Sequence, residues 1–125
     1  MEGYSVKIIN TSIEKMSGRE KIKYTSLTDT ISIKDKIKEE GSFTITPVDY
    51  VALAVHNENS KNKDYEVYLI IDKSGDIYST SSRSLFSSFI DIYDEMCGED
   101  EEYQIKIFSK PSKNNENPFL TCSIL

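Results

Sequence analysis

Residues 81–98 (SSRSLFSSFIDIYDEMCG) carry a wide apolar stripe with the period of an α-helix. The stripe consists of Leu85, Phe86, Phe89, Ile90, Ile92, Tyr93 and Met96. The hydroxyl of Ser81 or Ser82 can cap the start of the helix, and Gly98 suits its end. Because such a stripe must be buried, the rest of the chain must supply a surface on which this helix packs.

Strand patterns lie on both sides of the helix. We expect strands at residues 4–10, 42–46, 50–55, 65–71, 77–78, 103–108 and 119–125. Pro47 has no N–H to donate, so it predicts an edge or a bulge. Gly75 closes a turn after Asp72. Residues 11–41 stay open between a short helix, which the capping box at 17–20 favours, and a further strand.

This order predicts a mainly β fold with one confident helix. The expected architecture is an OB-fold-like, five-stranded, partly open barrel, with the helix between strands 3 and 4 closing one end. An α+β sandwich is the alternative. The 125 residues predict one domain, with a barrel core at 42–125 and an uncertain N-terminal unit at 1–41.

Several classes of protein are not expected. No apolar run approaches the ~20 residues of a membrane-spanning helix, and the first residues do not resemble a signal peptide. The sequence has no phosphate-binding glycine loop, no G-x-S-x-G and no H-E-x-x-H. It has one histidine and two cysteines, Cys97 and Cys122, which predict reduced thiols. We therefore expect no enzyme, no catalytic residue, no metal site and no cofactor.

Charge is distributed unevenly along the chain. The net charge is -6. Residues 91–102 contain seven acidic residues and no basic one, whereas residues 103–115 contain Lys106, Lys110 and Lys113 and no acidic one. Net charge governs solubility and long-range steering, and it leaves room for a local basic surface.

The segment YQIKIFSKPSK, residues 103–113, alternates lysines with aromatic rings. In its strand we expect Tyr103, Ile105 and Ile107 to point inward and Gln104, Lys106 and Phe108 to point outward. Proteins that bind single strands combine cations for phosphates with exposed rings for base stacking. A plain edge strand with solubilising lysines is the competing interpretation. The candidate nucleic-acid-binding residues are Tyr50, His56, Tyr68, Tyr78, Arg83, Lys106, Phe108, Lys110 and Lys113.

The acidic stretch supports a second hypothesis. An acidic surface can imitate a phosphate backbone, so the alternative function is that of an inhibitor or adaptor that binds another protein by imitating DNA. The candidate partner-binding residues are Asp94, Glu95, Glu99, Asp100, Glu101 and Glu102. A protein of this kind ignores DNA, which separates the two hypotheses.

Residues 42–125 resemble small phage single-stranded DNA-binding proteins of Firmicutes. The resemblance rests on V-H-N-E at 55–58, D-K-x-G-x-x-Y at 72–78, L-F-x-x-F-x-D-I-x-D-E-M at 85–96 and the ending S-K-N…P-F-L-T-C-S. It implies an OB-like protein that coats single-stranded DNA in replication or recombination, in the cytoplasm of an infected bacterial host. It places DNA contacts on the strand 2–3 face and in the loop 109–117.

The resemblance also bears on partners. DNA is expected ahead of RNA, a host or phage replication protein is a further candidate partner, and no membrane contact is expected. The oligomeric state is left open, with a dimer among the options. Many members of the family end in an acidic tail that recruits partners, but this chain ends in Ser-Ile-Leu. The acidic stretch 91–102 would therefore have to serve any recruiting role, or no such role exists. In this setting the second hypothesis becomes a phage-encoded inhibitor or adaptor that binds a host protein through that stretch.

Overall fold

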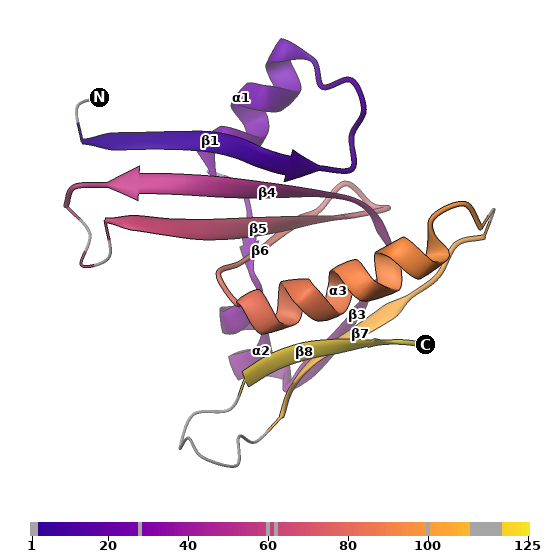
Figure 1. Cartoon of the computed structure of the whole chain (residues 1–125). Coiled ribbons are helices and arrows are strands. Elements are labelled where there is room, and N and C mark those ends of the chain that lie inside the picture. Colours follow the sequence, from indigo (N-terminus) through magenta and orange to yellow (C-terminus); the bar gives the residue numbers. More distant parts are fainter. Residues whose placement is uncertain (1–2, 28, 60, 62, 100, 111–118) are drawn as a thin grey trace.

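The computed structural model describes residues 3–27, 29–59, 61, 63–99, 101–110 and 119–125. Within them, eight strands and three helices are arranged around two sheets (Figure 1). The elements in chain order are β1 (Tyr4–Thr11), α1 (Gly18–Ser26), β2 (Ile31–Ser32), α2 (Ile33–Glu40), β3 (Ser42–Ile45), β4 (Pro47–Asn57), β5 (Asp64–Asp72), β6 (Ile77–Thr80), α3 (Arg83–Met96), β7 (Ile105–Lys110) and β8 (Phe119–Ile124).

The larger sheet, called sheet A, has the strand order β1-β4-β5-β6-β2, and the smaller one, sheet B, has the order β3-β7-β8. All neighbouring strands are antiparallel except β2 and β6, which are parallel. The chain crosses from sheet B to sheet A between β3 and β4. The register of β4 against β5 shifts between Pro47 and Asp49, so the expected bulge at the proline is confirmed.

The mainly β prediction is confirmed, but the five-stranded barrel is not. The described residues form two separate sheets and no closed barrel. The N-terminal unit, which the sequence left open, explains part of the difference. Strand β1 adds to the free side of β4, and the short β2 pairs with β6. Both strands enlarge sheet A instead of closing a barrel.

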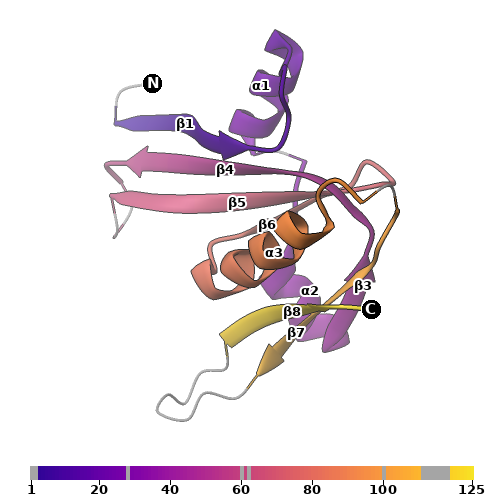
Figure 2. The ribbon, with the colours of Figure 1, turned by 45° about the vertical axis from the view of Figure 1, so that its right-hand side comes forward.

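Helix α3 lies between the two sheets, as two views show (Figures 1 and 2). The Ser82 hydroxyl accepts a hydrogen bond from the Leu85 N–H at 3.2 Å and caps the helix. Leu85 and Phe89 are fully buried and pack with Ile70 of sheet A and Ile107 of sheet B. The helix therefore buries the apolar stripe predicted from the sequence, and it joins the two sheets through one core.

The opposite face of sheet A has its own core. Tyr24 of α1 is buried there with Val51, Leu53 and Leu69. The helical interpretation of residues 17–20 is confirmed, because Ser17 and Glu20 form both hydrogen bonds of a capping box. Sheet A is thus covered by α1 on one face and by α3 on the other. No helix in the described part of the chain is both long and apolar enough to span a membrane.

Candidate nucleic-acid interface

The side chains of Lys106, Phe108 and Lys110 lie on one face of sheet B, turned away from the core. Ile105 and Ile107, at the alternate positions of β7, are fully buried on the other face. This arrangement confirms the predicted inward and outward positions of the strand. We call the outward side of the three strands the outer face of sheet B. Its residues are Ser42, Thr44, Lys106, Phe108, Lys110, Phe119 and Ser123. Thr121, which pairs with Phe108, instead places its hydroxyl 3.2 Å from that of Ser88 on α3.

The outer face of sheet B is basic, although the protein is acidic. None of the three strands β3, β7 and β8 contains Asp or Glu, whereas β4 and β5 of sheet A contain Asp49, Asp64, Glu66 and Asp72. Neither Lys106 nor Lys110 forms an ion pair with any described residue. Within the described part of the chain, both ammonium groups are thus without an acidic partner.

Aromatic rings accompany these lysines. The Lys106 Nζ lies 5.9 Å from the centroid of the half-buried Phe108 ring, within the range of a cation–π interaction. Phe119 lies opposite Lys110 across the β7–β8 ladder, and 41% of its surface is exposed. The sequence predicts a strand at Phe119, but this ring is not among the predicted binding residues. The strand pairing alone, with Lys110 opposite Phe119, would have identified it.

Three of the candidate stacking residues are buried, so the expectation of exposed rings is wrong for them. Tyr50, Tyr68 and Tyr78 expose only 9%, 5% and 7% of their surface. Tyr68 stacks on Phe86 of α3, and Tyr50 makes an edge contact with Tyr93 of the same helix. Burial raises the pKa of all three phenols. Tyr50 and Tyr68 pack against α3, and Tyr78 packs against Phe43 of β3. None of the three rings is therefore available to stack on a base.

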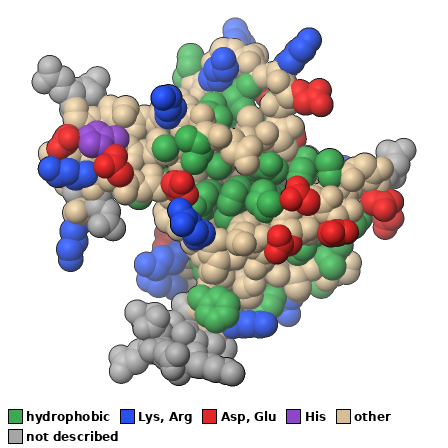
Figure 3. Space-filling view, in the orientation of Figure 1, with side chains coloured by type: hydrophobic (Ala, Val, Ile, Leu, Met, Phe, Trp, Pro, Cys, Tyr) green, Lys and Arg blue, Asp and Glu red, His purple; other side chains and the backbone are tan. Residues whose placement is uncertain are grey.

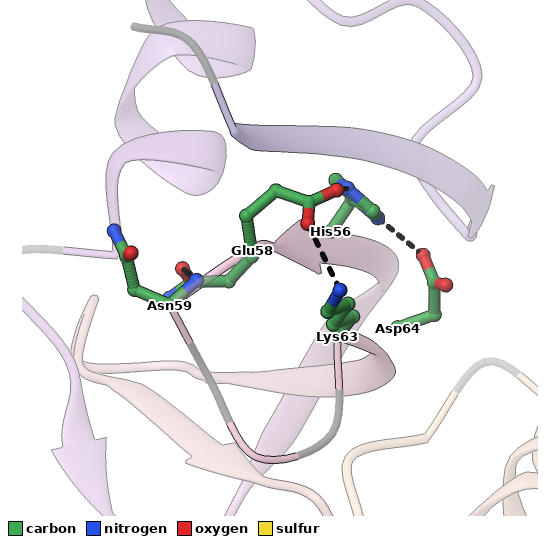
Figure 4. A network of polar contacts seen from close by, with 6 residues as sticks. His56, Glu58, Asn59, Lys63 and Asp64 are labelled. Atoms are coloured by element: carbon green, nitrogen blue, oxygen red, sulfur yellow. Dashed lines mark hydrogen bonds and ion pairs between the residues drawn. The ribbon is translucent and has the colours of Figure 1, made fainter.

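His56 lies at the end of β4 in a network of charged groups (Figure 4). Its Nδ1 is 2.7 Å from a carboxylate oxygen of Asp64, and its Nε2 is 2.7 Å from one of Glu58. Lys63 pairs with Glu58 at 3.3 Å. The hydrogen bond to Asp64, followed by that to Glu58, raises the pKa of His56. The imidazole thus joins two carboxylates across the β4–β5 connection.

Arg83 is also paired with a carboxylate. It occupies the first position of α3, as the sequence indicated, and its Nη2 lies 3.2 Å from Glu66. The Tyr68 hydroxyl donates to the same carboxylate, and this bond and the arginine lower the pKa of Glu66. His56, Tyr68 and Arg83 do line one open depression of about 680 Å³ on sheet A. Because its charges are mixed, this depression fits an anionic strand poorly.

The remaining candidates lie elsewhere. Lys113 and most of the loop 109–117 fall outside the described residues, and so does Asp100. The other acidic candidates form what we call the acidic surface, all exposed, at the C-terminal end of α3 and before β7: Asp94, Glu95, Glu99, Glu101 and Glu102. Glu102 pairs with Lys73 at 2.5 Å. Red side chains also lie along α3 in the space-filling view (Figure 3).

The geometry therefore divides the candidates into three groups. Lys106, Phe108 and Lys110 share the outer face of sheet B, and His56 and Arg83 are held by carboxylates on sheet A. The third group, Tyr50, Tyr68 and Tyr78, is buried. No protein-family model, curated protein or solved structure matches the chain. The resemblance to phage single-stranded DNA-binding proteins accordingly stays a prediction.

Proposed function

We propose that this protein binds single-stranded nucleic acid, DNA ahead of RNA, through the outer face of sheet B. The observation that carries the proposal is the grouping of Lys106, Phe108, Lys110 and Phe119 on one face of three strands that contain no acidic residue. Stacking platforms beside cations are the recurrent means of binding single strands without sequence preference. The resemblance supplies the proposed setting, which is the coating of single-stranded DNA in phage replication or recombination.

In the proposed mechanism, two kinds of side chain contact the nucleic acid. Lys106 and Lys110 contact phosphates, and Phe108 and Phe119 stack on bases. Residues on the same face of a strand are two positions apart, which is about 6.8 Å. This spacing is comparable with that of successive phosphates in an extended single strand, so β7 can follow the backbone. Two described lysines give a small electrostatic contribution, and we expect moderate, salt-sensitive affinity.

The order of the elements supports a relationship to the OB-fold in this proposal. Strands β4, β5 and β6 form an antiparallel succession, α3 follows, and β7 returns to pair with β3, which continues into β4. A helix between the third and fourth strands of a partly open barrel is the arrangement predicted from the sequence. In this proposal the barrel is open between β6 and β8, and the ligand lies on the strands after the helix.

Fluorescence anisotropy of a labelled oligo-dT strand tests the proposal, with a duplex of the same length as the comparison. The titrations are run at about 50 mM and about 200 mM salt, the range over which phosphate contacts weaken sharply. We expect the single strand to bind more tightly than the duplex and to lose affinity with salt. Absence of binding at both salt concentrations would overturn the proposal and favour the protein-binding alternative.

A further inference from the structure

A second surface of the molecule has the features of a docking site. Strand β1 and helix α1 border an open groove of about 700 Å³. Half-buried apolar side chains line it, together with basic ones from both elements. The residues that matter are Ile8, Ile13 and Met16, and the lysines Lys7, Lys15 and Lys21. One acidic residue, Glu14, also lines the groove, so the charge around it is predominantly positive.

Helix α1 extends this basic character beyond the groove. Arg19 and Lys23 are exposed, and between them Ile22 leaves 70% of its surface in solvent. Within the described part of the chain, Lys15, Arg19, Lys21 and Lys23 form no ion pair. Blue side chains lie beside apolar ones in the part of the space-filling view that contains α1, and red atoms are also present there (Figure 3). Unpaired cations around exposed apolar surface are typical of an interaction site.

The acidic surface also combines apolar and charged side chains, but its charge is negative. Glu99, Glu101 and Glu102 line shallow depressions together with apolar Val48 and Leu125. Val48 exposes 44% and Leu125 exposes 66% of its surface. Asp94 and Glu95 lie in the last turn of α3, where the helix macrodipole disfavours carboxylates. Their position is unfavourable for the isolated helix, and a basic partner would reverse that effect.

We propose that the groove between β1 and α1 binds the acidic surface of a second copy of this protein. Each surface has an apolar centre and a charged rim, which is the usual composition of a protein interface. The opposite charges of the two rims favour this encounter over a meeting of like surfaces. Because two different surfaces meet, the association is head-to-tail, and it extends into a filament unless the rotation closes a ring.

Sedimentation velocity of the full-length protein without nucleic acid tests this proposal separately from the proposed function. We expect the wild-type protein to self-associate at about 50 mM salt and to dissociate at about 200 mM. Lys15→Glu/Lys21→Glu and Glu99→Lys/Glu101→Lys should each remain monomeric alone. Mixed together, they should associate again, because the reversed groove of one meets the reversed acidic surface of the other.

A control matched to the lysine reversal carries the same change of charge elsewhere. Lys34→Glu/Lys61→Glu replaces two lysines that are exposed outside the groove, and it should associate like wild type. Circular dichroism confirms that each variant is folded. A wild-type monomer at low salt, self-association that either reversal leaves unchanged, or a mixture that stays monomeric would overturn the proposal. If the acidic surface bound a different protein and did not bind a second copy of this one, the proposal would also be overturned.

Discussion

The rings of Tyr68 on β5 and Phe86 on α3 lie nearly parallel, inclined by 8°, with their centroids 4.2 Å apart. This contact fixes the N-terminal half of α3 on sheet A. Tyr50 extends the same aromatic group, with its ring 5.7 Å from Phe86 and 6.0 Å from Phe89. Aromatic pairs of this kind contribute ~0.5–1.5 kcal/mol beyond the area that they bury.

The stacked pair yields a prediction on stability. Phe86→Ala should lower the free energy of unfolding by about 3 kcal/mol, because it removes a ring packed against two buried tyrosines. Phe119→Ala is the matched control. Its ring is exposed, so the loss should stay within about 0.5 kcal/mol. Urea denaturation measures both, and equal losses in the two variants would contradict this account of the core.

The same exposed ring should matter for binding. Phe108→Ala and Phe119→Ala should each weaken oligo-dT binding by about 1–3 kcal/mol, the contribution of one stacked base. Tyr4→Ala is the control, because Tyr4 is exposed on β1, away from sheet B. Anisotropy titrations compare the three variants with wild type. If Tyr4→Ala lost as much affinity as the two phenylalanine variants, the outer face of sheet B would not be the stacking surface.

His56 gives a prediction on pH. Hydrogen bonds to Asp64 and Glu58 raise its pKa above the ordinary value of 6.5. The charged imidazole therefore contributes stability in full below about pH 6.5, and this contribution is lost as the pH rises through the higher pKa of the folded protein. NMR titration of the imidazole should give a pKa above 6.5. Asp64→Asn should lower it more than Glu58→Gln, and an unperturbed wild-type value would show that the network does not form in solution.

The two cysteines should differ in reactivity. Cys97 is exposed, whereas Cys122 is buried, and burial raises the pKa of its thiol to about 11. Because the thiolate is the reactive form, a thiol reagent at neutral pH should label Cys97 rapidly and Cys122 only when the protein unfolds. Mass spectrometry after proteolysis identifies the labelled position. Rapid labelling of Cys122 in the native protein would contradict the packing of β8 on the core.

The pattern of single elements could be predicted from the sequence. The apolar stripe at residues 85–96 predicted α3, and the alternation around Ile105 and Ile107 predicted which side of β7 is buried. These predictions succeeded because local period determines which side of an element is apolar. The capping box at Ser17 and Glu20 likewise indicated α1, although the sequence left a strand as the alternative.

The covering of each face could not be predicted in the same way. Alternation along β4 places Tyr50 on one face of sheet A and Val51 and Leu53 on the other, in agreement with the two cores, but it does not show what covers each face. Both faces of sheet A are covered, one by α1 and the other by α3. Which helix packs on which face depends on contacts between residues that are far apart in the sequence. For the same reason the pairing of β1 with β4, and with it the division into two sheets, was not evident from local patterns.

The salt dependence of oligo-dT binding tests the central claim most directly. The measurement compares wild type with Lys106→Gln/Lys110→Gln, and with Lys34→Gln/Lys61→Gln as the control. Each phosphate contact contributes about 0.7 to the slope of log affinity against log salt for a single strand. If the outer face of sheet B binds the backbone, the first variant should lose about 1.4 from that slope, whereas the control should keep it. A slope that is unchanged in Lys106→Gln/Lys110→Gln would contradict the claim.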